Sequence, residues 1–143
     1  MLKGLDGRNI FLDDADRSIF MEKLNKARET GGFQLYAYCL MDNHDHLLIK
    51  EGEDLGTSIK RITVGYVQLH NNKYGRTGHL FQNRFSSEAV EDDKYLMTVI
   101  WYIHRNPLKT GMVSRLKEYS WSSYQQIIQA YQGNTSIIDH RYG

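Results

Sequence analysis

The stretch that decides the fold reads Met41-Asp42-Asn43-His44-Asp45-His46-Leu47-Leu48-Ile49. It predicts a β-strand that carries two histidines. Successive side chains of a strand point to opposite faces, so His44 and His46 project from the same face, with Cα atoms roughly 6–7 Å apart. Two imidazoles at this spacing can converge on one metal ion.

The histidine strand has a partner immediately before it in the sequence. The stretch from Phe33 to Leu40 is rich in aromatic residues and predicts a strand. Asp42-Asn43 supplies a turn, and the histidine strand then continues to about Lys50. Because the two strands are so close in sequence, we expect an antiparallel hairpin.

Helices are predicted on both sides of this hairpin. Asp13-Asp14-Ala15-Asp16 offers an N-cap and an acidic first turn, and the helix that follows ends at Gly31-Gly32. A second helix is predicted from Leu55 to Tyr74, with apolar residues on one stripe and Gly75 at its end.

The second half of the chain begins with a mixed basic and aromatic stretch. Arg76 to Phe85 predicts a loop, and a short strand is predicted from Phe85 to Val90. A helix that starts at Asp92 or Asp93 follows. It should end near Arg105, because the residue before Pro107 avoids the α region.

A last short helix is predicted from Ser122 or Ser123 to about Gln132. The order helix, hairpin, helix, strand, helix predicts an α+β fold in which helices cover an antiparallel sheet. The sequence shows no internal repeat, low-complexity tract or linker, so we expect residues 1–143 to form one domain.

Composition excludes several classes of protein. The 143 residues contain a single cysteine, Cys39, so no disulfide can form within the chain, which suits a reducing cytoplasm. The longest apolar runs are far too short for a membrane span. The segment from Met1 to Asp6 lacks the apolar core of a signal peptide. We therefore expect a cytoplasmic protein with no membrane partner.

The formal net charge of +1 is small for a nucleic-acid-binding protein, but the charges are unevenly distributed. A local basic face can hold phosphates even when the total charge is near zero. The alternative interpretation is that these residues form solvated helix faces. The candidate DNA-binding residues are Lys60, Arg61, Arg76, Arg84 and Arg105.

A second segment with possible chemistry is Trp101-Tyr102-Ile103-His104-Arg105-Asn106-Pro107. It places Tyr102 and Asn106 four residues apart, so both can face one site if the helix persists that far. Together with a metal-binding histidine pair, Tyr102 suggests tyrosine attack on a phosphodiester. Taken singly, the histidine pair is typical of a structural or surface strand, Tyr102 of a core residue, and Asn106-Pro107 of a helix-ending turn.

Five segments of the chain, in order, resemble the single-tyrosine HUH transposases, which include the insertion-sequence type and the REP-associated tyrosine transposases. They cover nearly the whole chain. The matching segments are Asn9-Ile10-Phe11 with Asp16-Arg17, Tyr36 to Ile49, Gly78 to Phe85, Tyr102 to Pro107, and Trp121-Ser122-Ser123.

The resemblance implies a ferredoxin-like fold of the HUH endonuclease type, usually dimeric, that cuts and rejoins single-stranded DNA with hairpin ends. In that family the HUH histidines bind a divalent metal, and they fall on His44 and His46. The nucleophile falls on Tyr102, and Asn106 completes the metal site. The implied product is a 5′-phosphotyrosine, and the implied metal is Mg²⁺ or Mn²⁺.

Two features depart from the family pattern. The middle residue of the HUH motif is typically bulky and hydrophobic, and here it is Asp45, whose carboxyl must be exposed, paired or protonated. Family members usually carry a fuller first strand before the segment that begins at Asn9, and here only Met1 to Leu5 remain, so we expect a shortened first strand. These departures leave two alternatives open: a DNA-binding remnant that no longer cuts, and a metal-dependent phosphodiesterase that uses water.

Overall fold

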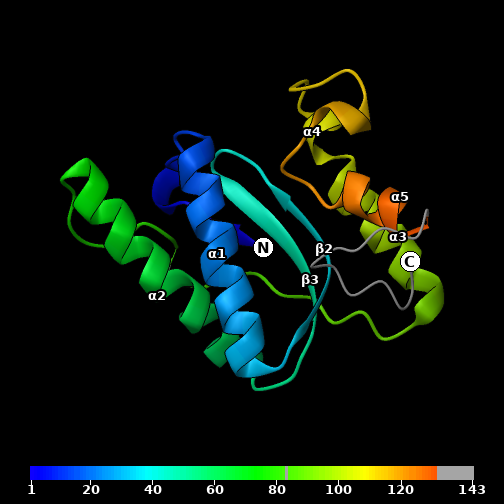
Figure 1. Ribbon diagram of the computed structural model, residues 1–143, viewed down its shortest axis with the longest axis horizontal. Helices are drawn as coiled ribbons and strands as arrows, with labels where there is room; N and C mark the ends of the chain where they lie inside the picture. Colours follow the sequence, from blue (N-terminus) through cyan, green and yellow to red (C-terminus); the bar gives the residue numbers. More distant parts are fainter. Residues whose placement is uncertain (83, 132–143) are drawn as a thin grey trace.

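The computed structural model describes residues 1–82 and 84–131. Within them, three antiparallel strands form a sheet in the order β1-β3-β2. Helices α1 and α2 cover one face of the sheet, and α3 lies on the other face (Figure 1). The elements are β1 (Leu2–Lys3), the 3-10 turn η1 (Leu5–Gly7), α1 (Asp14–Gly31), β2 (Gln34–Leu40), β3 (His44–Lys50), α2 (Leu55–Tyr74), α3 (Asp93–His104), α4 (Asn106–Lys109), the 3-10 turn η2 (Leu116–Glu118) and α5 (Tyr124–Tyr131).

The predicted hairpin is present and fixes which way the histidines point. Cys39 pairs with His46, and Leu40 pairs with Asp45. Directly paired residues point to the same face of a sheet. Cys39 belongs to the buried cluster under α3 and Leu40 to the cluster under α1 and α2. His46 therefore faces the α3 side, whereas Asp45 faces the α1 and α2 side.

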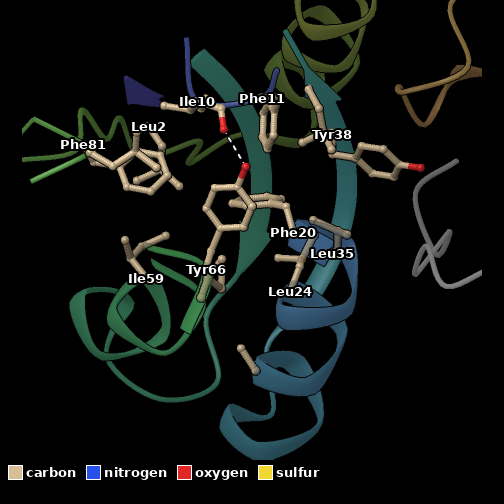
Figure 2. Close-up of a cluster of buried hydrophobic side chains, with 14 of the residues drawn as sticks. Leu2, Ile10, Phe11, Phe20, Leu24, Leu35, Tyr38, Ile59, Tyr66 and Phe81 are labelled. Atoms are coloured by element: carbon tan, nitrogen blue, oxygen red, sulfur yellow. Dashed lines mark hydrogen bonds between the residues drawn. The ribbon is translucent and has the colours of Figure 1, made fainter. Parts of the chain in front are cut away.

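The larger core lies between the sheet and the helices α1 and α2. Phe20 and Leu24 of α1 pack there with Ile62 and Tyr66 of α2 (Figure 2). The hydroxyl of Tyr66 donates to the backbone oxygen of Ile10, so this buried polar group has a partner. The apolar stripes predicted from helical spacing are thus the surfaces that hold both helices on the sheet.

The smaller core attaches α3 to the opposite face. Leu96, Ile100 and Ile103 recur at helical spacing and pack against β2 residues that include Tyr36 and Cys39. This packing leaves the neighbouring residue Tyr102 turned away from the core, with 43% of its surface exposed.

The predicted N-caps of α1 and α3 and the predicted glycine ends of α1 and α2 are present, and Asp54, which was not predicted as a cap, caps α2. The side chains of Asp13, Asp54 and Asp92 accept hydrogen bonds from backbone N–H groups in the first turns of α1, α2 and α3. Gly32 and Gly75 end α1 and α2 with φ values of 69° and 62°, in the left-handed region that glycine adopts most easily.

The prediction of a strand over residues 85–90 is wrong. Ser86 exchanges two backbone hydrogen bonds with Met1, but residues 85–92 carry no strand or helix. A strand needs a continuous partner, and β1 pairs with β3 only at Leu2 and Lys3. The expectation of a shortened first strand is met by this two-residue β1.

The region after Tyr102 also differs from the prediction. Helix α3 ends at His104, close to the predicted end, but the chain re-enters a helix at once as α4, with Pro107 in its first turn, where a missing N–H costs nothing. Helix α5 begins at Tyr124, just after the predicted serines, and the predicted end near Gln132 lies outside the described residues.

Asp45 is fully buried. It lies between Leu2 and Leu40 in the sheet, and neither carboxyl oxygen has a hydrogen-bond partner among the described residues. Burial raises the pKa of Asp45 to about 8, and the nearby Met1 ammonium opposes this only in part. Of the three states expected for this carboxyl, the protonated one fits the structure.

None of the helices in the described part of the chain combines the length and apolar character that crossing a bilayer requires.

Candidate active site

The structure brings the two histidines and the tyrosine together. The ring centroids of His44 and His46 are 5.1 Å apart, and those of His46 and Tyr102 are 6.0 Å apart. The histidines come from β3 and the tyrosine from α3, so the packing of α3 on the sheet creates the group. A phenol and two imidazoles therefore face one another at a partly exposed surface.

Both imidazoles are held in the neutral form that metal ligands require. Burial lowers the pKa of His46 to about 4, with a further contribution from His44. Burial also lowers the pKa of His44, and the charge of Lys3 adds to the effect. His44 Nδ1 is 2.8 Å from Asn43 Oδ1, which accepts a hydrogen bond from the Nδ1–H and leaves Nε2 free to bind a cation.

Asn106 lies one turn beyond Tyr102, as the spacing predicted, but its side chain already has partners. Its amide nitrogen donates to the backbone oxygens of Tyr102 and Ile103, at 3.1 and 3.3 Å. The nitrogen thus ties the end of α3 to the start of α4. Only the amide oxygen Oδ1 could serve a metal.

The donor set fits a weakly held divalent cation. Among the described residues, no group of three or more histidine, cysteine or carboxylate side chains could hold a metal. His44, His46 and the oxygen of Asn106 would leave several coordination positions for water or phosphate oxygens. Two imidazoles and one amide oxygen are donors that several divalent cations accept, so the side chains alone do not select the metal.

Arg105 is the one candidate DNA-binding residue that lies beside Tyr102. Its guanidinium carbon is 5.3 Å from the Tyr102 ring centroid and 4.7 Å from that of Trp101. The half-buried side chain places a permanent positive charge next to the phenol.

The other predicted DNA-binding residues lie on α2, which covers the opposite face of the sheet, or in the segment that follows it. Lys60 and Arg61 are exposed on α2, and Arg76 and Arg84 are exposed in the segment that follows α2 (Figure 1). Arg61 differs from the rest, because Glu53 accepts hydrogen bonds from its Nε and Nη2 at 2.5 and 3.1 Å. Its charge is largely neutralised within the protein.

The sequence did not predict a buried link between α3 and β2. His104 Nε2 lies 2.6 Å from Ser123 Oγ, and this hydroxyl accepts from the Tyr38 N–H at 2.9 Å. Burial lowers the pKa of His104 to about 4, so its ring is neutral. The only available signal was the co-occurrence of His104 and Ser123 in two of the segments that carry the family resemblance.

Comparison with known proteins gives consistent results. Residues 6–106 match the family described as transposase IS200 like. A Haemophilus influenzae protein described as a REP-associated tyrosine transposase is 28% identical in an alignment 147 residues long. The alignment covers 89% of this chain and 83% of that protein.

A solved structure of a REP-associated tyrosine transposase bound to a REP hairpin has the same fold. It matches with a TM-score of 0.76 at 18% identity, over 99% of this chain and 87% of that chain. The match confirms the predicted fold class of helices packed on an antiparallel sheet.

Proposed function

Because this chain belongs to the family of IS200-like transposases, we propose that it nicks and rejoins single-stranded DNA through Tyr102. The observation that carries the proposal is the convergence of His44, His46 and Tyr102 from a strand and a distant helix. A core tyrosine would have been buried by the packing of α3, but Tyr102 is exposed beside the histidines.

The proposed reaction exchanges one ester bond for another. The phenol oxygen of Tyr102 attacks phosphorus and gives up its proton, the bond from phosphorus to the 3′ oxygen breaks, and that oxygen takes up a proton. The products are a 5′-phosphotyrosine and a free 3′ hydroxyl, and attack by a 3′ hydroxyl reverses the step without ATP. Arg105 would hold the phosphate in line with the phenol.

We propose that His44 and His46, with Asn106 Oδ1, hold Mg²⁺ or Mn²⁺. Their neutral rings and the open remaining positions support this assignment. When bound, the cation supplies Lewis-acid polarisation of the scissile phosphate.

The proposed partner is a single-stranded DNA with hairpin ends. The structural relative bound to a REP hairpin supports this substrate class. Lys60, Arg76 and Arg84 are exposed and available for phosphates, whereas the ion pair with Glu53 makes Arg61 a weaker candidate. The homodimer implied by the family resemblance stays a prediction.

We also place the activity in the cytoplasm of a bacterial or archaeal cell. The bacterial relative and the free, buried thiol of Cys39 support this location.

The first test is covalent trapping. Hairpin-bearing oligonucleotides incubated with the protein and Mn²⁺ should yield a protein–DNA adduct that denaturing gels resolve. The adduct should be lost in Tyr102→Phe and kept in Tyr95→Phe, which changes another exposed tyrosine of the same helix.

The other outcomes identify the alternatives. An adduct that persists in Tyr102→Phe shows that the nucleophile is a different residue. Metal-dependent cutting without any adduct indicates a phosphodiesterase that uses water. Tight hairpin binding with no cutting indicates a DNA-binding remnant, the alternative that the buried carboxyl of Asp45 favours.

A further inference from the structure

Trp101 is unusually exposed for a tryptophan. It lies on α3 next to Tyr102, and 57% of its surface is exposed. The guanidinium of Arg105, one turn later, lies over its ring at 4.7 Å. Met97, one turn earlier on the same helix face, is also 51% exposed, and adjacent exposed apolar side chains mark binding surfaces more often than isolated ones do.

The sequence on either side of Trp101, between Asp93 and Glu118, is basic, and this composition indicates what binds there. Residues 94–117 contain five basic side chains and no carboxylate, although the whole chain is almost neutral. The basic residues are Lys94, Arg105, Lys109, Arg115 and Lys117. An aromatic side chain within a basic segment is the combination that binds unpaired bases together with their phosphates.

We propose that Trp101 and Arg105 form a stacking platform for an unpaired nucleobase next to the scissile phosphate. The proposal rests on the function proposed for Tyr102 and deepens it, because it assigns the residues that hold the unpaired nucleotide beside the cut. We refer to Trp101 and Arg105 together as the Trp101 platform.

The geometry suits this role. Arg105 lies over both the Trp101 ring and the Tyr102 ring, so it limits the movement of the indole and brings positive charge to the phenol. Every nucleobase has an aromatic face, and an indole or a planar guanidinium can therefore stack with it whatever its sequence. The neighbouring phosphate would then lie at Arg105 and Tyr102.

A second copy of this chain is a poorer occupant of the same surface. A two-fold contact through Trp101 would bring Arg105 and Lys109 of one copy close to the same residues of the other. No carboxylate of residues 94–117 could neutralise them. A polynucleotide instead supplies the opposite charge.

Tryptophan fluorescence tests the platform without any need for cleavage. The chain has two tryptophans, and Trp121 is partly buried with its indole N–H bonded to Asp14. In EDTA, a hairpin with a single-stranded tail should quench wild-type emission, whereas the same hairpin without a tail should quench it far less. Trp101→Phe, which keeps Trp121, should lose the tail-dependent quenching.

Affinity provides the second readout. Trp101→Ala should weaken binding of the tailed hairpin by about tenfold, the change expected when one stacked base is lost, and should leave the tailless hairpin unaffected. Trp101→Phe should retain most of the affinity. The control Ile128→Ala removes an exposed apolar side chain from α5 and should change neither value.

Equal quenching by both hairpins, or unchanged affinity of Trp101→Ala for the tailed hairpin, overturns the platform. A change in molecular mass of Trp101→Ala by sedimentation, with DNA affinity unchanged, would assign the surface to self-association and also overturn it. Quenching without adduct formation would refute the proposed nicking while leaving the platform intact. Adduct formation without quenching would support the proposed nicking and overturn the platform.

Discussion

Asp45 is a buried acid that lies, in the sequence, between the two proposed metal ligands His44 and His46. Its carboxyl lies in the hydrocarbon core beside Leu2 and Leu40, and no hydrogen bond among the described residues compensates for its loss of hydration. The group therefore destabilises the fold whenever it is ionised. This effect is separate from the chemistry of the histidines, because it acts on the opposite face of β3.

This reasoning predicts an unusual dependence of stability on pH. The pKa of Asp45 is raised to about 8, so the folded chain keeps a proton that the unfolded chain releases above about pH 4. The contribution of Asp45 to the free energy of unfolding should fall as pH rises from about 4 to about 8, and level off above that. Asp45→Leu should remove this loss and gain about 1–3 kcal/mol at pH 8.

Urea unfolding in EDTA at pH 5 and pH 8 measures the effect. The control Asp45→Asn keeps the shape and polarity of the side chain but cannot titrate, so its stability relative to the wild type should also increase between the two pH values. If Asp45→Asn and the wild type differ in stability by the same amount at both pH values, Asp45 does not cause the pH dependence.

At the scale of elements, the position of α3 decides whether Tyr102 reaches the histidines. The hydrogen bond between His104 and Ser123 links the end of this helix to β2, whose residue Cys39 pairs with His46. His104 is thus a positioning residue. Its loss should let α3 shift while the hairpin-binding residues on α2 stay in place.

We expect His104→Ala to slow adduct formation by about tenfold or more, since small misplacements of reacting groups have large effects on rate. Hairpin affinity should change little, and His104→Gln, which can still hydrogen-bond to Ser123, should recover part of the rate. Single-turnover adduct kinetics and equilibrium binding separate the two effects. The control is His79→Ala, at an exposed loop position. Equal losses of rate and affinity would indicate general damage to the fold.

The elements that the sequence predicted well are those specified by nearby residues. Helices α1 and α2 begin at aspartate caps and end at glycines, and the hairpin follows from two apolar strands around a short turn. The two-residue strand β1 has no comparable local signal. The absence of a strand over residues 85–90 depends on a missing neighbour, which sequence patterns do not reveal.

The site was predictable to a similar extent. Strand alternation alone placed His44 and His46 on one face, but only the family resemblance joined them to Tyr102, because their approach depends on the packing of α3. The pairing of Arg61 with Glu53 and the contact of His104 with Ser123 both join residues on different elements or loops. No periodicity in the sequence records such contacts.

At the scale of the whole molecule, the candidate DNA-binding residues fall into two sets. Arg105 lies on the α3 side with Tyr102, whereas Arg76 and Arg84 lie in the segment that follows α2. This segment runs back alongside β1, where Gln82 N–H donates to the backbone oxygen of Lys3. We therefore expect the two sets to serve different steps, with Arg76 and Arg84 binding the hairpin and Arg105 acting at the reacting phosphate.

The double variant Arg76→Ala/Arg84→Ala should bind the hairpin more weakly and show a smaller dependence on salt. The slope of log affinity against log salt concentration should decrease by about one for each lost phosphate contact. Adduct formation at saturating DNA should keep the wild-type rate. Lys26→Ala, which removes an exposed charge from α1, should leave the slope unchanged. An unchanged slope in the double variant would show that Arg76 and Arg84 contact no DNA phosphate.

The two-sided arrangement has a geometric consequence for the substrate. A strand gripped beside α2 and cut beside α3 must travel around the edge of the sheet, and a taut polynucleotide has a fixed reach. The thickness of the domain would then set the smallest number of nucleotides between the recognised hairpin stem and the phosphate that is cut.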